Sequence, residues 1–275
     1  MTKQMMGIVV LFVYTLIRSL FIEPNALEIT RYEIEDNRLQ GVRVAFLSDF
    51  HLKRRDYKRL DKIVRMTNSQ DPDIILLGGD FARGFSEKDT MNFDIMAQKL
   101  SLLSAPTYAV LGHHDWSNNG EKIITSLRNN CIRVLENSNI RTSVKKRYLD
   151  IIGLADLQMR TPKISQALRR TAQPRIILTH NPEVYFNIID EVSLIFAGHT
   201  HGGQFILPFT TPFFVNSKYG SEFASGVIKK TINKMVITRG LGTTGLPVRL
   251  NCKPEILIVD FVREGTAKPI RKRRY

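Results

Sequence analysis

Residues 195–205 read IFAGHTHGGQF: an apolar run ends in two histidines that one threonine separates, and two glycines follow. The run before them, SLIFA at 193–197, is short and nearly continuous, which is typical of a strand buried on both faces of a sheet. One histidine beside a strand is more often a core or surface residue than a ligand. Two histidines directly after such a strand favour a site at the sheet edge.

The other histidines of the chain follow the same pattern. There are six in all, and each lies just after an apolar run rich in β-branched residues. None is scattered through the stretches that resemble helices or loops, so chance explains their positions poorly. They are His51, His113, His114, His180, His199 and His201.

Eight apolar runs of this kind recur along the chain, and helix-compatible stretches lie between several of them. This alternation predicts an α/β sandwich in one catalytic domain. Because open α/β sheets bind ligands beyond the carboxyl ends of their strands, the histidines can converge on one cleft. The expected strands are 42–47, 73–77, 107–111, 148–154, 175–179, 193–197, 234–238 and 255–262, and the expected helices are 57–68, 91–103, 120–129 and 164–171.

Composition limits the partners without choosing one. Forty Lys and Arg against twenty-six Asp and Glu give a net charge of +14, which favours polyanions such as anionic lipid, phosphorylated substrates or nucleic acid. The basic clusters lack the interleaved aromatics of a nucleic-acid surface, so nucleic acid is not the expected partner. Cys131 and Cys252 have no metal-binding spacing and are expected to be free thiols. We expect a monomer.

The two ends of the chain differ from its middle. Residues 5–22, MMGIVVLFVYTLIRSLFI, are about one bilayer-crossing length if helical, although Arg18 interrupts them. A membrane anchor, a cleaved signal and a soluble amphipathic helix are all compatible, and an uncleaved anchor or interfacial helix is favoured. Residues 1–25 are therefore taken as this segment, 26–264 as the catalytic domain and 265–275 as a basic tail. The many Lys and Arg after the apolar segment favour a cytoplasmic domain.

Carboxylates join the histidines in several motifs. The segments SDFH and GHTH supply Asp49 with His51 and His199 with His201, and GGD supplies Asp80. If these segments are extended, residues two apart point the same way, so each pair can hold a metal ion. Two pairs suggest two ions, with Asp80 between them. Imidazole nitrogen and carboxylate oxygen suit Mn, Fe or Zn and, less readily, Mg.

The series Asp-x-His, Gly-Gly-Asp, Gly-x-His-Asp, His and Gly-His-x-His resembles the calcineurin-like metallophosphoesterase superfamily, from about residue 43 to 261. The segments GHTHGGQ, RGLGTTGLPVR and KPEILIV narrow the resemblance to bacterial membrane-associated members. These include phosphodiesterases and the UDP-2,3-diacylglucosamine pyrophosphatases of lipid A synthesis. The resemblance implies a four-layer α/β/β/α sandwich with a dinuclear metal site, most simply manganese, at the carboxyl ends of the strands.

The resemblance also implies roles for individual residues. His114 would contact the scissile phosphate and assist the leaving group, and Asp115 would orient His114. A metal-activated hydroxide would attack phosphorus in line. One metal would be held by Asp49, His51, Asp80 and His201, and the other by Asp80, His113, His180 and His199.

This sequence departs from the family pattern at one ligand. It has GHHD where the family usually has GNHD, so His113 replaces an asparagine. Imidazole still ligates divalent metals but shifts preference toward softer ions. His113 is therefore expected to remain a ligand, against the alternative that it has left the coordination shell.

Three functions compete. The first is a membrane-associated hydrolase of a phosphodiester or pyrophosphate, such as UDP-2,3-diacylglucosamine. The second, motivated by the charge, is a nucleotide or nucleic-acid phosphodiesterase, and the third is a scaffold that has lost catalysis. The aromatic stretch 205–215, FILPFTTPFFV, is more simply buried packing than an acyl-chain platform. Arg249 is a candidate phosphate-binding residue, with pairing to an acidic neighbour as the alternative.

Overall fold

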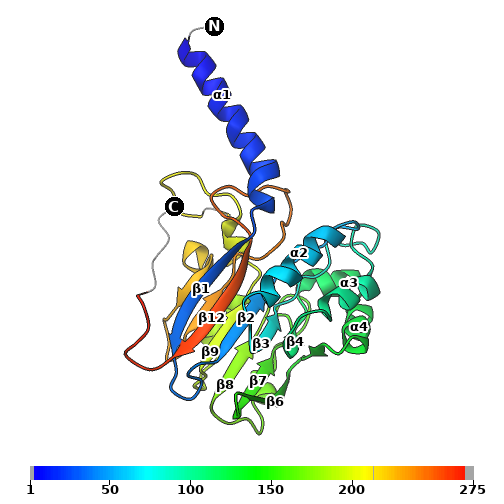
Figure 1. Cartoon of the computed structure of the whole chain (residues 1–275), viewed down its shortest axis with the longest axis vertical. Coiled ribbons are helices and arrows are strands. Elements are labelled where there is room, and N and C mark those ends of the chain that lie inside the picture. The colour runs from blue at the N-terminus through cyan, green and yellow to red at the C-terminus, as the bar shows by residue number, and fades with distance from the viewer. Residues whose placement is uncertain (1–2, 213, 270–275) are drawn as a thin grey trace.

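Two six-stranded sheets lie face to face at the centre of the protein, with helices outside them (Figure 1). The computed structural model describes residues 3–212 and 214–269. The sheet orders are β1-β12-β2-β3-β4-β5 and β10-β11-β9-β8-β7-β6. The strands are β1 Glu28–Glu35, β2 Arg43–Leu47, β3 Ile74–Leu77, β4 Thr107–Ala109, β5 Arg133–Val134, β6 Ser138–Val144, β7 Arg147–Gly153, β8 Arg175–Leu178, β9 Leu194–Ala197, β10 Gly226–Ile228, β11 Met235–Ile237 and β12 Glu255–Val262.

The apolar runs form the central strands because each of these strands is covered on both faces. Between the sheets, the rings of Phe46 and Phe196 meet edge to face at 5.4 Å. The neighbouring residues of β2 and β9, Ala45 and Ile195, face outward into the helical layers instead. All eight expected strands are confirmed, with ends that differ from the prediction by a residue or two.

Helices cover the two outer faces unequally. Three helices pack on the first sheet through residues such as Leu60, Met96 and Ile123, which are buried. The second sheet is covered by the short α5 and by 3₁₀ turns, with Tyr185 and Phe223 in its core. The expected four-layer α/β/β/α order is thereby confirmed. The helices are α1 Lys3–Ile17, α2 Tyr57–Asn68, α3 Phe93–Leu100, α4 His113–Asn129 and α5 Ile164–Ala167.

Four strands were missed because they lie at sheet edges or beside them. Strand β1 alternates charged and apolar residues, EITRYEIE, and pairs in parallel with β12 alone. An edge strand is only partly covered, so it lacks the continuous apolar run of a central strand. The others are β5, β6 and β10. The helix expected at 120–129 begins earlier, at His113, and the one expected at 164–171 ends at Ala167.

The N-terminal segment forms a helix that projects from the domain (Figure 1). Residues Lys3–Asn25 are long and apolar enough to cross a membrane, and only 6% of their most apolar window is buried. The base of this helix is tied to the domain: the main-chain N–H of Cys252 donates to Glu23 Oε1 at 2.6 Å, and that of Arg249 donates to Ser19 O at 2.9 Å. The end of the predicted basic tail, residues 270–275, lies outside the described residues.

Strand direction brings the polar motifs to the end of the sandwich from which this helix emerges. β2, β3 and β4 are parallel in one sheet, as are β8 and β9 in the other, so the motifs that follow them lie at the same edge. β1 begins at Glu28, directly after the helix, and its partner Glu255 donates its N–H to Gly240 O. Gly240 in turn packs against Asp49. The polar motifs therefore lie beneath the helix base.

Candidate dinuclear metal site

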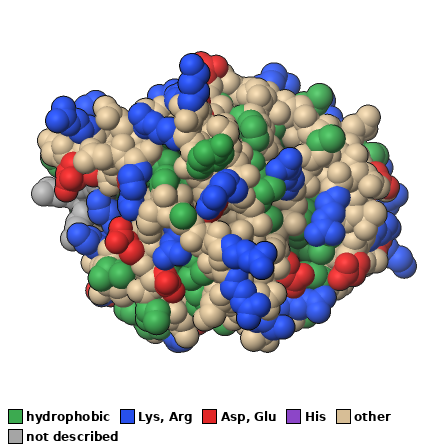
Figure 2. Space-filling view, turned by 90° about the horizontal axis from the view of Figure 1, so that it is seen from below, with side chains coloured by type: hydrophobic (Ala, Val, Ile, Leu, Met, Phe, Trp, Pro, Cys, Tyr) green, Lys and Arg blue, Asp and Glu red, His purple; other side chains and the backbone are tan. Residues whose placement is uncertain are grey.

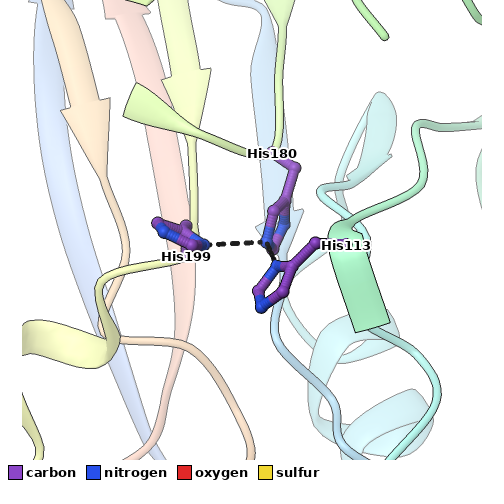
Figure 3. A group of neighbouring side chains, drawn as sticks. All are labelled: His113, His180 and His199. Carbon is purple, nitrogen blue, oxygen red and sulfur yellow. Dashed lines mark hydrogen bonds between the residues drawn. The ribbon is translucent and has the colours of Figure 1, made fainter. Parts of the chain in front are cut away.

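Six imidazoles and two carboxylates converge at this edge in four overlapping groups of three, of which two share no residue. The first group is Asp49, His51 and His201, and the second is His113, His180 and His199 (Figure 3). Within each group the potential ligand atoms all lie within 4.8 Å of one another. The division is the one that the resemblance implied, and it arises from five loops that follow different strands.

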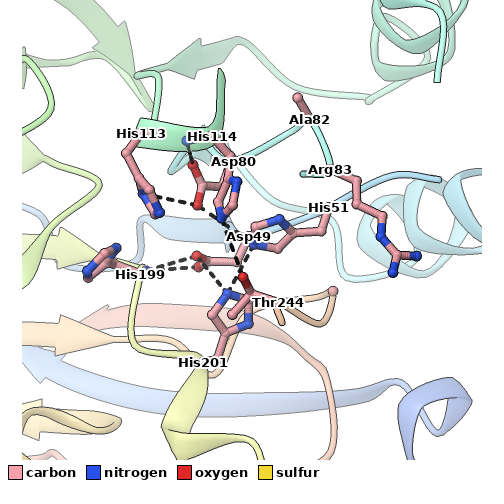
Figure 4. Close-up of polar contacts among 12 residues, drawn as sticks. Asp49, His51, Asp80, Ala82, Arg83, His113, His114, His199, His201 and Thr244 are labelled. Atoms are coloured by element: carbon pink, nitrogen blue, oxygen red, sulfur yellow. Dashed lines mark hydrogen bonds and ion pairs between the residues drawn. The ribbon is translucent and has the colours of Figure 1, made fainter. Parts of the chain in front are cut away.

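Asp80 lies between the two groups (Figure 4). Its Oδ2 is 3.7 Å from His51 Nε2 in one group, and 3.4 Å from His113 Nδ1 and 3.3 Å from His180 Nε2 in the other. This oxygen is buried and accepts no hydrogen bond, whereas Oδ1 accepts the main-chain N–H of His114 at 2.9 Å. A buried carboxylate oxygen aimed at three imidazole nitrogens has the placement of a bridge between two cations.

The backbone of the SDFH and GHTH segments is not extended. The expectation that residues two apart in these segments point the same way is therefore wrong. Asp49, His51, His199 and His201 all have φ between 42° and 74°, in the left-handed region. Because of this tight conformation, His199 and His201 turn to different groups rather than gripping one ion together. Thr200 between them points away and donates its hydroxyl to Ala224 O at 2.7 Å.

Two glycines let the loops approach the carboxylates. A Cβ on Gly112 would lie 2.2 Å from Asp80 Oδ1, and one on Gly198 would lie 2.5 Å from Asp49 Oδ2. These distances are shorter than any van der Waals contact, so a side chain at either position would displace a carboxylate of the cluster. The glycines in the GHHD and GHTH motifs thus allow the backbone to approach the two carboxylates closely.

Burial sets the protonation states of the cluster. It lowers the pKa of His51 to about 3 and of His113 to about 4, and it lowers the pKa of His201 well below its usual value, so these rings are neutral donors at pH 7. Burial opposes ionisation of Asp80 and His180, but their mutual attraction prevails, lowering the pKa of the first and raising that of the second.

The cluster fits two divalent cations. It combines neutral imidazoles with two buried carboxylates, and the unpartnered buried atoms include Asp80 Oδ2 and His201 Nδ1. His180 Nδ1 donates to Gly78 O at 2.8 Å, which directs its Nε2 toward Asp80, as a second hydrogen bond commonly orients a ligating histidine. Nitrogen and oxygen donors without thiolate suit Mn, Fe or Zn.

His114 is fixed by groups other than the one expected. A carbonyl oxygen only accepts, so His114 Nδ1 carries the proton that it donates to Gly84 O at 3.0 Å. Its Nε2 then lies 3.4 Å from the hydroxyl of Thr244, and the ring offers a potential ligand atom within 4.8 Å of those of His51 and Asp80. Asp115 does not touch the ring. Its carboxylate instead accepts the N–H groups of Ala82 and Gly112, at 2.9 and 3.0 Å.

The expected direct role of Asp115 in orienting His114 is therefore wrong. The residue lies in the first turn of α4, where its buried carboxylate accepts main-chain N–H groups at the helix start and in the loop beyond β3. Burial and the charge of Asp80 raise the pKa of Asp115 to about 7. Asp115 thus positions the backbone that carries Asp80 and His114, and it contacts no reacting atom.

Arg249, the candidate phosphate-binding residue, does not face the cluster as a free cation. It is fully buried, and its guanidinium donates to main-chain oxygens of the segment that covers the cluster, including Gly242 at 3.0 Å, Cys252 at 2.9 Å and Arg239 at 2.7 Å. The guanidinium N–H groups that would bind a phosphate therefore already donate to these carbonyl oxygens. Arg249 is a structural residue, and no carboxylate among residues 3–212 and 214–269 forms an ion pair with it.

Three residues near the cluster were not predicted. Thr244 faces His114, and Asn216 Nδ2 lies 2.9 Å from His199 Nε2. Arg83 follows Ala82, which bridges to Leu52 beside His51, and its half-buried guanidinium has no ion pair among the described residues. In Figure 4 it lies on the His51 side of the cluster. Nothing in the local sequence distinguishes these side chains, because the loops that place them lack regular structure.

Comparison with known proteins agrees with this class of site. Residues 42–203 match the calcineurin-like phosphoesterase family, so the chain belongs to that family. It is a metallophosphoesterase, a metal-dependent hydrolase that acts on phosphate esters.

Relatives of known sequence match over most of the chain. It is 31% identical to phosphodiesterase YaeI of Escherichia coli, over 88% of this chain and 91% of that one. It is 30% identical to the metallophosphoesterase YkuE of Bacillus subtilis, over 86% of each chain. A transmembrane protein with a metallophosphoesterase domain from Danio rerio is 28% identical, over 79% of this chain and 52% of its own length.

Proposed function

We propose that this protein hydrolyses a phosphodiester or pyrophosphate bond in a membrane-associated substrate such as the nucleotide-linked lipid UDP-2,3-diacylglucosamine. The observation that supports this choice is the short path from the cluster to the apolar helix. Cys252 donates its thiol to the carbonyl of the ligand candidate His201 at 3.3 Å, and its N–H to Glu23 at the helix base. If the helix anchors the chain, the catalytic cleft lies close to the bilayer, with the domain on the cytoplasmic side.

The residues of the cluster would have two roles in hydrolysis, metal binding and proton donation. Two divalent ions, when bound, supply a nucleophile at neutral pH and stabilise the charge of the transferred phosphoryl group. The two three-residue groups would hold one ion each, and Asp80 would share its carboxylate between them. His114 donates its Nδ1 proton to Gly84 O, so its Nε2 can donate a proton to the departing oxygen only when the ring is an imidazolium that carries a second proton on Nε2.

The experiment that tests this function compares three substrates with purified full-length protein in Mn²⁺, Zn²⁺ or Mg²⁺. They are UDP-2,3-diacylglucosamine, bis-p-nitrophenyl phosphate and single-stranded DNA. We expect the nucleotide-lipid to have the highest kcat/KM. Hydrolysis confined to the small diester would reject the lipid substrate, and preferential hydrolysis of DNA would support a nuclease instead.

His113→Asn is expected to retain activity with an altered metal preference. The ring lies in the second group, 3.3 Å from His180 Nε2, and asparagine would offer a harder oxygen donor in its place. The ratio of activity with Mn²⁺ to activity with Zn²⁺ should therefore rise, as measured by titrating each metal into metal-free protein. Complete inactivity of a folded variant with every metal would contradict this assignment.

Arg83→Met is expected to raise KM with little change in kcat. If the guanidinium, which lies beyond His51 in Figure 4, contacts a phosphate oxygen of the substrate, that charge-assisted hydrogen bond would contribute about 1.5–3 kcal/mol, and KM should rise roughly tenfold. Steady-state kinetics with bis-p-nitrophenyl phosphate measure this effect. Lys88→Met, on the exposed part of the same loop, is the matched control and should leave KM unchanged.

A further inference from the structure

Large apolar side chains are exposed around the base of the N-terminal helix. Phe209 is 97% exposed and Leu246 is 72% exposed, and Leu207 is also exposed. They belong to two loops, residues 204–216 and 243–251, which flank the helix base at the upper end of Figure 1. Phe21, at the base itself, is exposed as well. We call these four side chains the apolar rim.

The two loops and the helix base form one hydrogen-bonded unit. Gln204 bonds the main chain of Thr244 in both directions, at 3.0 and 2.8 Å. The N–H of Ile206 donates to Leu250 O at 2.9 Å, and that of Arg249 donates to Ser19 O in the helix. The rim is therefore held in place relative to the helix, rather than carried on independent loops.

The same loops are attached to the cluster. The first leaves the sandwich directly after His201 and returns at Asn216, which contacts His199. The second begins beside Thr244, which contacts His114. Any surface that engages the rim thus lies close to the cluster. The opposite end of the molecule shows no histidine and carries Lys and Arg among acidic residues (Figure 2).

Unneutralised positive charge continues from the rim along one side of the helix base. A groove of about 620 Å³ lies between the helix end and α2, lined by Pro24 and Leu27 together with Arg55, Lys58 and Lys62. Asp56 also lines it, and its carboxylate pairs with Arg59 at 3.8 Å. None of the three cations Arg55, Lys58 and Lys62 has a carboxylate partner among the described residues. Apolar side chains that protrude beside free basic residues match the acyl and headgroup layers of an anionic membrane.

We propose that the apolar rim inserts into the bilayer surface beside the N-terminal helix, so that the metal cluster lies next to the lipid headgroups. The partner is the membrane itself, because the rim is continuous with a helix that is apolar enough to span it. One part of this inference rests on the proposed function: a lipid substrate would reach the cluster without leaving the membrane. It also explains why Leu207 and Phe209 are exposed in the stretch 205–215, which was expected to be buried packing and in which Ile206 is buried.

The test uses tryptophan as a depth probe. Phe209→Trp and Leu246→Trp are each made in full-length protein carrying Trp116→Phe, which removes the one native tryptophan. The protein is reconstituted in vesicles of phosphatidylethanolamine and phosphatidylglycerol, with or without brominated acyl chains. Tyr148→Trp, 72% exposed at the start of β7 and far from the helix, is the matched control.

Brominated chains should quench both rim probes roughly threefold more than the control probe, because interfacial side chains lie within about 5–10 Å of the headgroup boundary. Equal quenching of rim and control probes would overturn the proposal. As a second measurement, Phe209→Ser with Leu246→Ser should raise KM for a substrate in vesicles roughly tenfold, since apolar area no longer inserts. KM for bis-p-nitrophenyl phosphate should stay unchanged, and an equal rise for that soluble diester would count against the rim.

The two proposals fail in different ways. Strong quenching of the rim probes without any hydrolysis of UDP-2,3-diacylglucosamine would retain the membrane surface and reject that substrate. Hydrolysis of the nucleotide-lipid with quenching no greater than that of the control would retain the substrate and reject the rim.

Discussion

Asp80→Asn is expected to lower kcat roughly a thousandfold, equivalent to about 4 kcal/mol of transition-state stabilisation. Asp80 Oδ2 faces nitrogens of both histidine groups, and an amide removes the negative charge that would be shared by two cations. Metal content should fall below two ions per chain. Steady-state kinetics and elemental analysis of the purified variant measure both effects.

The matched control for this change is Asp150→Asn. Asp150 is also buried, but it pairs with Arg141 on the second sheet, away from the cluster. That variant should keep both ions and the activity of the parent protein. If Asp80→Asn kept full metal content and kcat, Asp80 could not bridge the two groups, and the division of ligands inferred above would need revision.

Arg249→Met is expected to reduce the free energy of unfolding by about 4 kcal/mol, because several buried carbonyl oxygens would lose their donor and each unsatisfied group costs roughly 1–3 kcal/mol. The affected oxygens include those of Gly242 and Cys252, in the segment that covers the cluster. Denaturant unfolding in detergent measures the loss. Arg249→Lys should be intermediate, since one ammonium cannot reach all of these carbonyls.

The comparison with Arg83→Met separates structural from substrate-binding arginines. Arg83 is half-buried and has no ion pair within the described part of the chain, so its loss should change KM while leaving the unfolding curve in place. Arg249→Met should do the reverse, lowering stability before any effect on KM. A variant of Arg249 with normal stability and a raised KM would restore the original hypothesis that this residue binds phosphate.

The position of the cluster relative to the helix affects how substrates would arrive. A soluble metallophosphoesterase can receive its substrate from any direction, whereas here the loops at the mouth of the cleft are hydrogen-bonded to the helix base. If the chain is anchored, that geometry favours substrates whose phosphoryl group lies at the membrane surface. The basic groove beside the helix would further concentrate anionic headgroups there.

Much of the fold could be inferred from the sequence because the central strands are buried on both faces. Runs such as 74–77 and 194–197 leave no room for polar residues, so they are visible without any alignment. Edge strands such as β1 are only partly buried. Their sequences mix charged and apolar residues, and this pattern does not distinguish them from loops. The helix end at Ala167 was likewise not visible locally.

The sequence by itself determined the family, the central strands and the residues that supply the cluster, since ligating side chains follow buried strands in a fixed order. Only the tertiary structure decided which groups those residues touch. Asp115 accepts backbone N–H groups rather than orienting His114, and Arg249 is buried among carbonyls. Such roles depend on individual contacts between loops distant in the chain, and the spacing of residues along a sequence does not show which atoms of those loops will touch.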